Sequence, residues 1–229
     1  MMSSPHAVQN SSVACSATIL AAGLGRRLGN RPKAALRIGG SSLLERLTRA
    51  LREAGCDKVN VVVGTHASVL APLAMRCGAE VLRHSLENPE LIDSQRLAIE
   101  RHAGICPGQD MLLLVADLPL LTEQDIVALL EAWRARKYAT MAQVPVVNGV
   151  RGHPVILAWD VIRQIQRAPA HVGVREWMQA HSESVAFIES DRTGFVTDLD
   201  TPEDFVALRA RMHPIEVTLP PNANDTNEH

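Results

Sequence analysis

A glycine-rich segment at residues 18–36 carries residue types that could hold a polyanion. The segment reads TILAAGLGRRLGNRPKAAL. Gly23 and Gly25 allow backbone N–H groups to turn inward and approach a bound anion closely. Arg27 offers a planar fork that grips two phosphate oxygens at once, and Lys33 adds a point charge. A backbone cradle, a fork and a point charge together suit a triphosphate.

The spacing in this segment argues against two other phosphate-binding loops. Gly23 and Gly25 begin a G-x-G pattern, but the position three after Gly25 is Leu28, so the dinucleotide-binding G-x-G-x-x-G pattern is not completed. The G-x-x-x-x-G-K-[ST] pattern of a P-loop cannot be drawn here either. The alternative is a plain flexible turn between a strand and a helix, and Arg26 is expected to be a solvated neighbour.

Apolar runs and helical patterns alternate along the chain and define the elements that must position this loop. Strand-like runs cover residues 17–23, 58–64, 79–83, 110–117, 139–146, 153–158 and 184–190. Helical patterns cover residues 42–54, 66–77, 92–102, 122–136, 159–167, 174–181 and 202–212. The early strands are continuous Val and Leu runs, typical of strands buried on both faces of a parallel sheet. The sequence therefore predicts a three-layer α/β/α sandwich with a mostly parallel central sheet.

We expect one domain at residues 13–212, between two polar tails at residues 1–12 and 213–229 that are rich in Pro, Ser and Asn and read as disordered. In a parallel sheet, ligands bind beyond the carboxyl ends of the strands. The glycine-rich loop and the loop after residues 110–117 both fall at such ends. Asp117 lies in the second of these loops, so we expect it near the bound ligand.

Five segments in order resemble the MobA-like nucleotidyltransferase family. LAAGLGRRLGNRPK resembles the family signature L-A-A-G-x-G-x-R-[LM]-G…P-K, and it is followed by SSLLERLTRALREAGCDKVNVVVG, ADLPLL, GVRGHPVIL and DLDTPEDF. The resemblance covers residues 17–212 and lies nearest to the subgroup similar to molybdenum cofactor cytidylyltransferases. It implies the nucleotide-diphospho-sugar transferase fold and transfer of a nucleotidyl group from a nucleoside triphosphate to a phosphorylated acceptor, with release of pyrophosphate.

The resemblance also implies the partners and the site residues. CTP is the favoured nucleotide, molybdopterin the acceptor, and a client molybdoenzyme a further partner. The implied catalytic residues are Arg27, Lys33 and Asp117. The implied nucleotide-binding residues are Leu20, Ala21, Ala22, Gly23, Gly25, Arg27, Lys33, Asn88 and Ser94. Two alternatives stay open: an acceptor such as a sugar 1-phosphate, and a nucleotide- or cofactor-binding chaperone for a molybdoenzyme.

Nucleotidyl transfer brings an anionic nucleophile onto an anionic phosphate, a problem that Mg²⁺ bound by one or two carboxylates usually solves. Asp117 ends a very apolar strand, and Thr122 is better placed than Asp117 to cap the following helix. Asp198 and Asp200 alternate along an extended segment, so one of the two faces the metal. The resemblance favours Asp200, with a capping role as its competitor and Asp198 as the fallback.

The acceptor side is predicted around NGVRGHP and HVGVREW. The resemblance makes Arg151, Gly152, His153 and Arg175 candidates for acceptor contacts. A hairpin loop and a helix-surface salt bridge are the structural alternatives. The segment ENPELIDSQRL departs from the family, because Ile-Asp stands where Gly-Met is usual. Asp93 could there accept a hydrogen bond from an amino group of the base.

Composition limits the other functional classes. The chain of 229 residues is 46% hydrophobic and 21% charged, and its formal net charge of −2 offers no basic field for nucleic acid. Its four cysteines form no CxxC pair, which predicts reduced thiols and a cytoplasmic location. The apolar stretch at residues 12–23 follows no Lys or Arg and is shorter than the about 18 apolar residues of a membrane span, so we expect a buried strand and no membrane partner.

Overall fold

The computed structural model describes residues 15–221, and a mostly parallel sheet forms its centre. The strands are β1 (Cys15–Ala21), β4 (Val59–Val63), β5 (Glu80–Arg83), β6 (Asp110–Val115), β7 (Ala142–Val147), β8 (Val150–Arg151), β9 (Val155–Leu157) and β10 (Val185–Glu189). Their order is β10-β7-β9-β6-β1-β4-β5, with β8 paired to β7. Only β9, beside β6 and β7, and β8, beside β7, run antiparallel among these strands. The predicted parallel sheet is confirmed.

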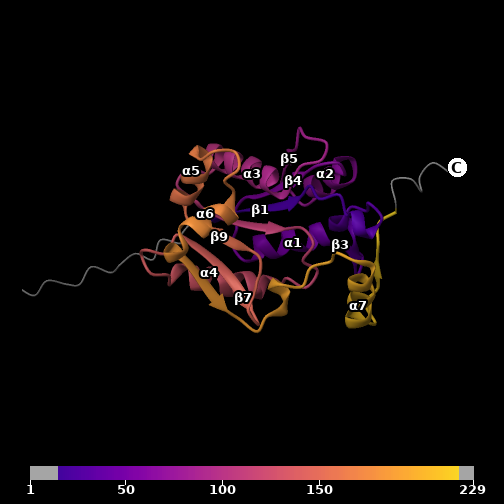
Figure 1. Ribbon diagram of the computed structural model, residues 1–229. Coiled ribbons are helices and arrows are strands. Elements are labelled where there is room, and N and C mark those ends of the chain that lie inside the picture. Colours follow the sequence, from indigo (N-terminus) through magenta and orange to yellow (C-terminus); the bar gives the residue numbers. More distant parts are fainter. Residues whose placement is uncertain (1–14, 222–229) are drawn as a thin grey trace, which may run out of the picture.

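Helices cover both faces of the sheet and give the three layers expected from the sequence (Figure 1). They are α1 (Leu43–Glu53), α2 (Ala67–Arg76), α3 (Leu91–Ile105), α4 (Glu123–Arg134), α5 (Trp159–Arg167) and α6 (Val174–Ala180). Helix α7 (Pro202–Met212) lies to the side of the central sheet (Figure 1). Buried side chains of α1, α2 and α4 pack on one face, and those of α3, α5 and α6 pack on the other. Neighbouring residues of β1 serve opposite faces: Ile19 joins the first core and Leu20 the second. This explains the continuous apolar runs.

A second sheet, not predicted from the sequence, ties down the C-terminal region. It joins β2 (Arg37–Ile38), β3 (Ser41–Ser42) and β11 (Val217–Thr218) in the order β11-β2-β3. Val217 and Ile38 are buried together with Leu208 of α7. The prediction of a tail from residue 213 is therefore wrong for residues 213–221, because Val217 is buried beside Ile38 and Leu219 packs against the same cluster. The predicted tail at residues 1–12, and residues 222–229, lie outside the described residues.

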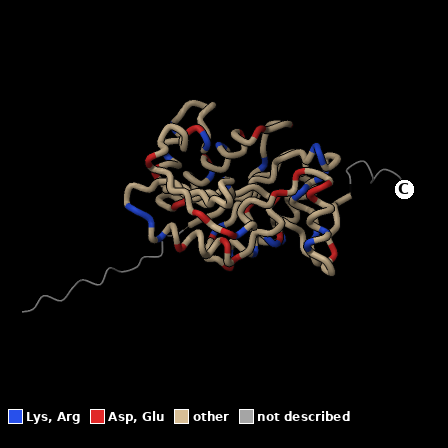
Figure 2. The backbone as a smooth tube through the Cα atoms, turned by 60° about the horizontal axis from the view of Figure 1, so that its bottom comes forward, with Lys and Arg blue, Asp and Glu red and all other residues tan. Residues whose placement is uncertain are grey.

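Charged residues of both signs are interspersed along the chain (Figure 2). This distribution fits the small net charge of −2. An anionic ligand is therefore expected to be attracted by individual loops that carry several cations, and not by the surface as a whole. Within residues 15–221, no helix combines the length and the apolar character needed to cross a membrane.

A buried histidine makes the stability of the fold depend on pH. The ring of His102 lies between the Ser16 hydroxyl and the Gln109 carbonyl oxygen, each 2.8 Å from a ring nitrogen. Burial lowers the pKa of His102 below its ordinary value of 6.5, and burial also lowers the pKa of His153. The unfolded chain therefore binds more protons than the folded chain once the pH falls below about 6.5. The free energy of unfolding should decrease as the pH falls from 7.5 to 5.5.

Urea unfolding at pH 7.5, 6.5 and 5.5 measures this effect. His102→Gln should show a shallower pH dependence than the wild type, with the remainder due to groups such as His153. An unchanged pH dependence in His102→Gln would contradict the assignment.

Candidate functional site

The glycine-rich loop leaves β1 at the carboxyl edge of the sheet and folds on itself. Gly25 has a φ of 64°, and its carbonyl oxygen accepts hydrogen bonds from the N–H groups of Leu28 and Asn30 at 2.9 and 3.0 Å. A Cβ atom at Gly25 would lie 2.2 Å from the carbonyl oxygen of Arg31. Both the left-handed backbone and this close approach therefore require glycine.

Gly25→Ala is expected to lower the free energy of unfolding by about 1–3 kcal/mol and to weaken nucleotide binding, because the loop must shift to relieve the contact. Gly104→Ala is the matched control. Gly104 lies within α3, and no heavy atom outside its own helix lies within 4 Å of a Cβ built there. Alanine should stabilise that position by up to about 1 kcal/mol. Denaturant titrations of both variants measure the difference, and equal effects would refute the role of Gly25.

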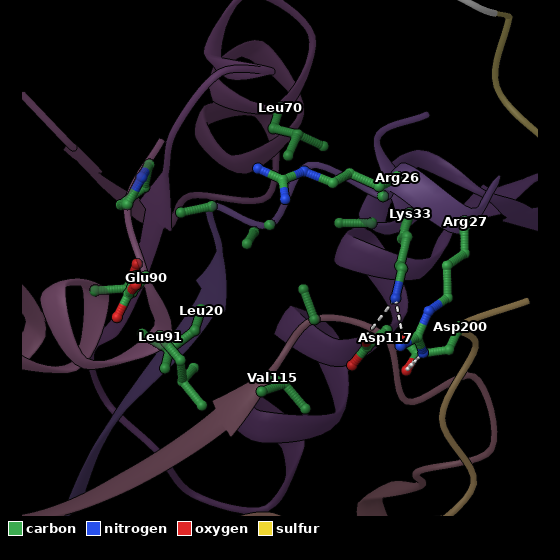
Figure 3. Close-up of a pocket in the computed structure, with 18 residues that line it drawn as sticks. Leu20, Arg26, Arg27, Lys33, Leu70, Glu90, Leu91, Val115, Asp117 and Asp200 are labelled. Carbon is green, nitrogen blue, oxygen red and sulfur yellow. Dashed lines mark hydrogen bonds and ion pairs between the residues drawn. The ribbon is translucent and has the colours of Figure 1, made fainter. Parts of the chain in front are cut away.

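Lys33 lies between two carboxylates that come from distant parts of the chain (Figure 3). Its Nζ donates to Asp117 Oδ2 at 3.1 Å and to Asp200 Oδ1. Arg27 Nη1 lies 3.5 Å from Asp200 Oδ2. Lys33 begins a short 3-10 turn (Lys33–Ala35), Asp117 follows β6, and Asp200 precedes α7. We call Arg27, Lys33, Asp117 and Asp200 the charged cluster.

Electrostatics keep Lys33 protonated. Burial opposes its charge, but the hydrogen bonds and charges of Asp200 and Asp117 outweigh burial and raise the pKa of the ammonium above its ordinary value. Asp117 Oδ1 is buried and has no hydrogen-bond partner among the described residues. Because buried carboxylate oxygens are normally paired, this atom is available to a further cation.

The charged cluster opens into a pocket of about 410 Å³. The pocket is lined by Leu20, Ala21, Ala22, Gly23, Gly25, Arg26, Arg27, Lys33, Ala34, Leu70, Pro89, Glu90, Leu91, Ser94, Val115, Ala116, Asp117 and Asp200. The structure thus brings together every predicted nucleotide-binding residue except Asn88. The volume of the pocket suits a small-molecule ligand.

Two threonines cap the helices that follow the carboxylates, which leaves the carboxylates to the pocket. The Thr122 side chain accepts from Asp125 N at the start of α4, as predicted. The Thr201 side chain accepts from Asp204 N at the start of α7. The capping alternative for Asp200 is therefore replaced by its contact with Lys33.

The structure separates the two aspartates that alternate before α7. Asp200 lines the main pocket, whereas Asp198 lines a second cavity of about 130 Å³ beside α7. Burial, and then the charges of Asp200 and Asp117, raise the pKa of Asp198. The charges of the cluster therefore affect the pKa of Asp198, although Asp198 does not line the main pocket. This agrees with the prediction that the side chains of Asp198 and Asp200 point to opposite faces of the extended segment.

The predicted acceptor residues around β8 lie outside the lining of the main pocket. The guanidinium of Arg151, in β8, lies 4.6 Å from the centre of the ring of Phe187, which belongs to β10. A Cβ at Gly152 would lie 2.4 Å from the Phe195 carbonyl oxygen, so packing explains this glycine. His153 Nδ1 is enclosed, without a hydrogen-bond partner among the described residues. Because β6 and β7 both run antiparallel to β9, they end at the same edge of the sheet. The loop that follows β7 therefore lies at the edge that also holds Asp117, and its contacts with the acceptor stay a prediction.

Three further predicted contacts are arranged differently. Asn88 and Arg175 are exposed and do not line the main pocket. Asp93 does not face a base: its Oδ2 accepts the backbone N–H of Glu90 at 2.8 Å at the start of α3. The expectation that Asp93 recognises an amino group is therefore wrong, because the third residue of a helix can satisfy an unpaired N–H there.

Several residues that line the pocket were not predicted from the sequence, above all Arg26 and Glu90. Figure 3 shows the Arg26 side chain extending toward Leu70. Arg26 is exposed, as expected of a solvated neighbour, and it also lines the pocket, which was not expected. Its position beside Arg27 in a glycine-rich loop was the available signal. Glu90 follows an Asn-Pro pair just before a helical pattern, but only the fold brings that helix start next to β1.

The chain is similar in sequence and in structure to several known proteins. The chain is 31% identical to the molybdenum cofactor guanylyltransferase of Nitrobacter hamburgensis over 159 residues, covering 69% of this chain and 68% of the relative. It is 22% identical to the molybdenum cofactor cytidylyltransferase of Escherichia coli K12, covering 84% of this chain and 94% of the relative. The crystal structure of Rv0371c from Mycobacterium tuberculosis matches with a TM-score of 0.69 and 27% identity, covering 85% of this chain and 97% of that one. Rv0371c has also been solved with manganese.

Other relatives are much longer than the matched region. The chain is 32% identical to the bifunctional protein GlmU of Syntrophomonas wolfei over 135 residues, which is 58% of this chain but 29% of that protein. The family model described as the MobA-like NTP transferase domain matches residues 17–185. These residues hold the glycine-rich loop, Lys33, Asp117 and the sheet that positions them, and the chain belongs to the MobA-like NTP transferase family.

Proposed function

We propose that the protein is a Mg²⁺-dependent nucleotidyltransferase that moves CMP from CTP to molybdopterin and releases pyrophosphate. The charged cluster at the end of the glycine-rich loop is the observation that carries this proposal. It combines two cations for a triphosphate with two carboxylates for a divalent metal. The cytidylyltransferase and guanylyltransferase relatives support the acceptor. A cytoplasmic location belongs to the same proposal.

The residues present fit a divalent metal that takes some of its ligands from the protein and the others from the substrate and water. Within residues 15–221, no three His, Cys, Asp or Glu side chains are arranged as a metal site. Mg²⁺ does not need such a cage, because it is commonly held by one or two carboxylates, substrate phosphates and water. The unpartnered Asp117 Oδ1 and the Asp200 carboxylate would hold it. When bound, the metal neutralises charge on the phosphates.

The other residues would bind and orient the nucleotide. Gly23 and Gly25 would let backbone N–H groups approach phosphate oxygens. Lys33 and Arg27, now paired with Asp117 and Asp200, would exchange these partners for phosphate oxygens. The acceptor's phosphate oxygen would attack the α-phosphorus, and the bond to pyrophosphate would break. Such catalysis depends mainly on positioning and on charge neutralisation.

Pyrophosphate release by the purified protein tests the proposal. CTP, GTP, UTP, ATP and dTTP are each combined with Mg²⁺ and with molybdenum-loaded molybdopterin, unloaded molybdopterin or sugar 1-phosphates. We expect release with CTP and loaded molybdopterin. Release with a sugar 1-phosphate would keep the reaction and overturn the acceptor. Tight binding of nucleotide and cofactor with no release would instead favour a chaperone for a molybdoenzyme.

A further inference from the structure

The main pocket has two chemically different ends. Figure 3 shows Glu90 and Leu91 on the side of the pocket opposite the charged cluster. The walls near them include Leu20 and Val115, and Ser94 adds a polar side chain. If the triphosphate lies at the charged cluster, the base of the nucleotide extends toward the end that holds Glu90. Apolar walls suit the faces of a base, and polar groups read its edge.

The carboxylate of Glu90 is not used to cap its own helix. Glu90 precedes α3, but its side chain makes no capping hydrogen bond. The side chain of Asp93 performs that task by accepting from the backbone N–H of Glu90. The carboxylate of Glu90 therefore lines the pocket and is not required for capping α3.

Ser94 provides a second polar group on the same face of the helix. It lies four residues after Glu90, a spacing that stacks side chains along one helix face. Its backbone N–H bonds to the Glu90 carbonyl oxygen at 3.2 Å. Ser94 is only 3% exposed, yet it lines the pocket. A hydroxyl donates as well as accepts, whereas an ionised carboxylate only accepts.

We infer that Glu90 is a specificity-determining residue that favours nucleotides whose base presents an exocyclic amino group. An amino group, as in cytosine, donates a hydrogen bond to the carboxylate, and Ser94 can donate to a neighbouring acceptor of the base. Uracil presents a carbonyl oxygen in place of that amino group, so two acceptors would face each other. This inference rests on the proposed function, because it requires a nucleoside triphosphate in this pocket.

Calorimetric titration of CTP and UTP, with Mg²⁺ and without acceptor, tests the inference. The wild type should bind CTP at least about tenfold more tightly than UTP, because hydrogen bonds to charged groups are among the stronger ones. In Glu90→Gln the ratio should fall toward one, mainly through tighter UTP binding, since an amide can also donate to a carbonyl oxygen. Glu87→Gln is the matched control, because Glu87 is exposed on the same loop and does not line the pocket. It should keep the wild-type ratio.

The outcomes separate the inference from the proposed function. If the wild type binds both nucleotides and Glu90→Gln leaves their ratio unchanged, the role of Glu90 is overturned while the proposed function stands. If the wild type binds neither nucleotide, the proposed function fails, and the inference fails with it. Equal changes in Glu90→Gln and Glu87→Gln would also overturn the inference, because a general charge effect would then explain both.

Discussion

Asp117→Asn is expected to lower kcat/KM for pyrophosphate release by about 10³-fold or more and to leave the fold intact. The amide keeps the shape of the carboxylate but cannot neutralise a divalent cation, whose charge stabilisation is worth several kcal/mol. Asp117 also carries the buried oxygen that lacks a partner among the described residues. Steady-state kinetics measure kcat/KM, thermal unfolding measures the stability of the fold, and Mn²⁺ titration measures the affinity for a divalent metal, which should fall.

Asp198→Asn provides the comparison for Asp117→Asn. Asp198 lines a different cavity, so its substitution should reduce activity far less. An equal loss in the two variants would give Asp198 a role equal to that of Asp117 and contradict the separation of Asp198 from the charged cluster. Unchanged turnover in Asp117→Asn would remove the metal-binding role of Asp117 altogether.

Lys33→Ala is expected to move two properties in opposite directions. Turnover should fall by about 10²- to 10³-fold, because a positioned cation for the phosphates is lost. The affinity for Mn²⁺ in the absence of nucleotide should rise, because the ammonium no longer lies between Asp117 and Asp200. Its removal leaves two neighbouring carboxylates with less neutralising charge, and these attract a metal ion more strongly.

Lys137→Ala is the control for Lys33→Ala, since Lys137 is exposed and does not line the main pocket. It should match the wild type in kinetics and in Mn²⁺ affinity. Weaker Mn²⁺ binding in Lys33→Ala would contradict the view that Lys33 competes with a metal for these carboxylates.

The fold was largely predictable because local signals and tertiary packing agree. The runs that give β4 and β6 are rich in Val and Leu, and the run that gives β1 is also largely apolar. Thr122 and Thr201 mark helix starts where the structure has capping boxes. β11 was not predictable, because its burial depends on Ile38, which is distant in sequence. A two-residue strand carries no periodicity of its own.

The phosphate end of the pocket was predictable, whereas at its other end Ser94 was expected and Glu90 was not. Lys33 and Asp117 could be singled out from a glycine-rich loop and from the end of an apolar strand. The direction of a side chain within an irregular loop could not be derived, which is why Arg26 was not expected to line the pocket. Asp93 and Glu90 are three residues apart, and which of them caps α3 decides which one faces the pocket.

Transfer of the α-phosphate tests the central claim most directly. The protein is incubated with Mg²⁺, CTP labelled at the α-phosphorus and molybdenum-loaded molybdopterin, and the label is followed by chromatography. The account predicts that the label moves to the acceptor, that the pyrophosphate released is unlabelled, and that Asp117→Asn abolishes the transfer. Release of labelled CMP to water with no labelled acceptor, or transfer that persists in Asp117→Asn, would contradict it.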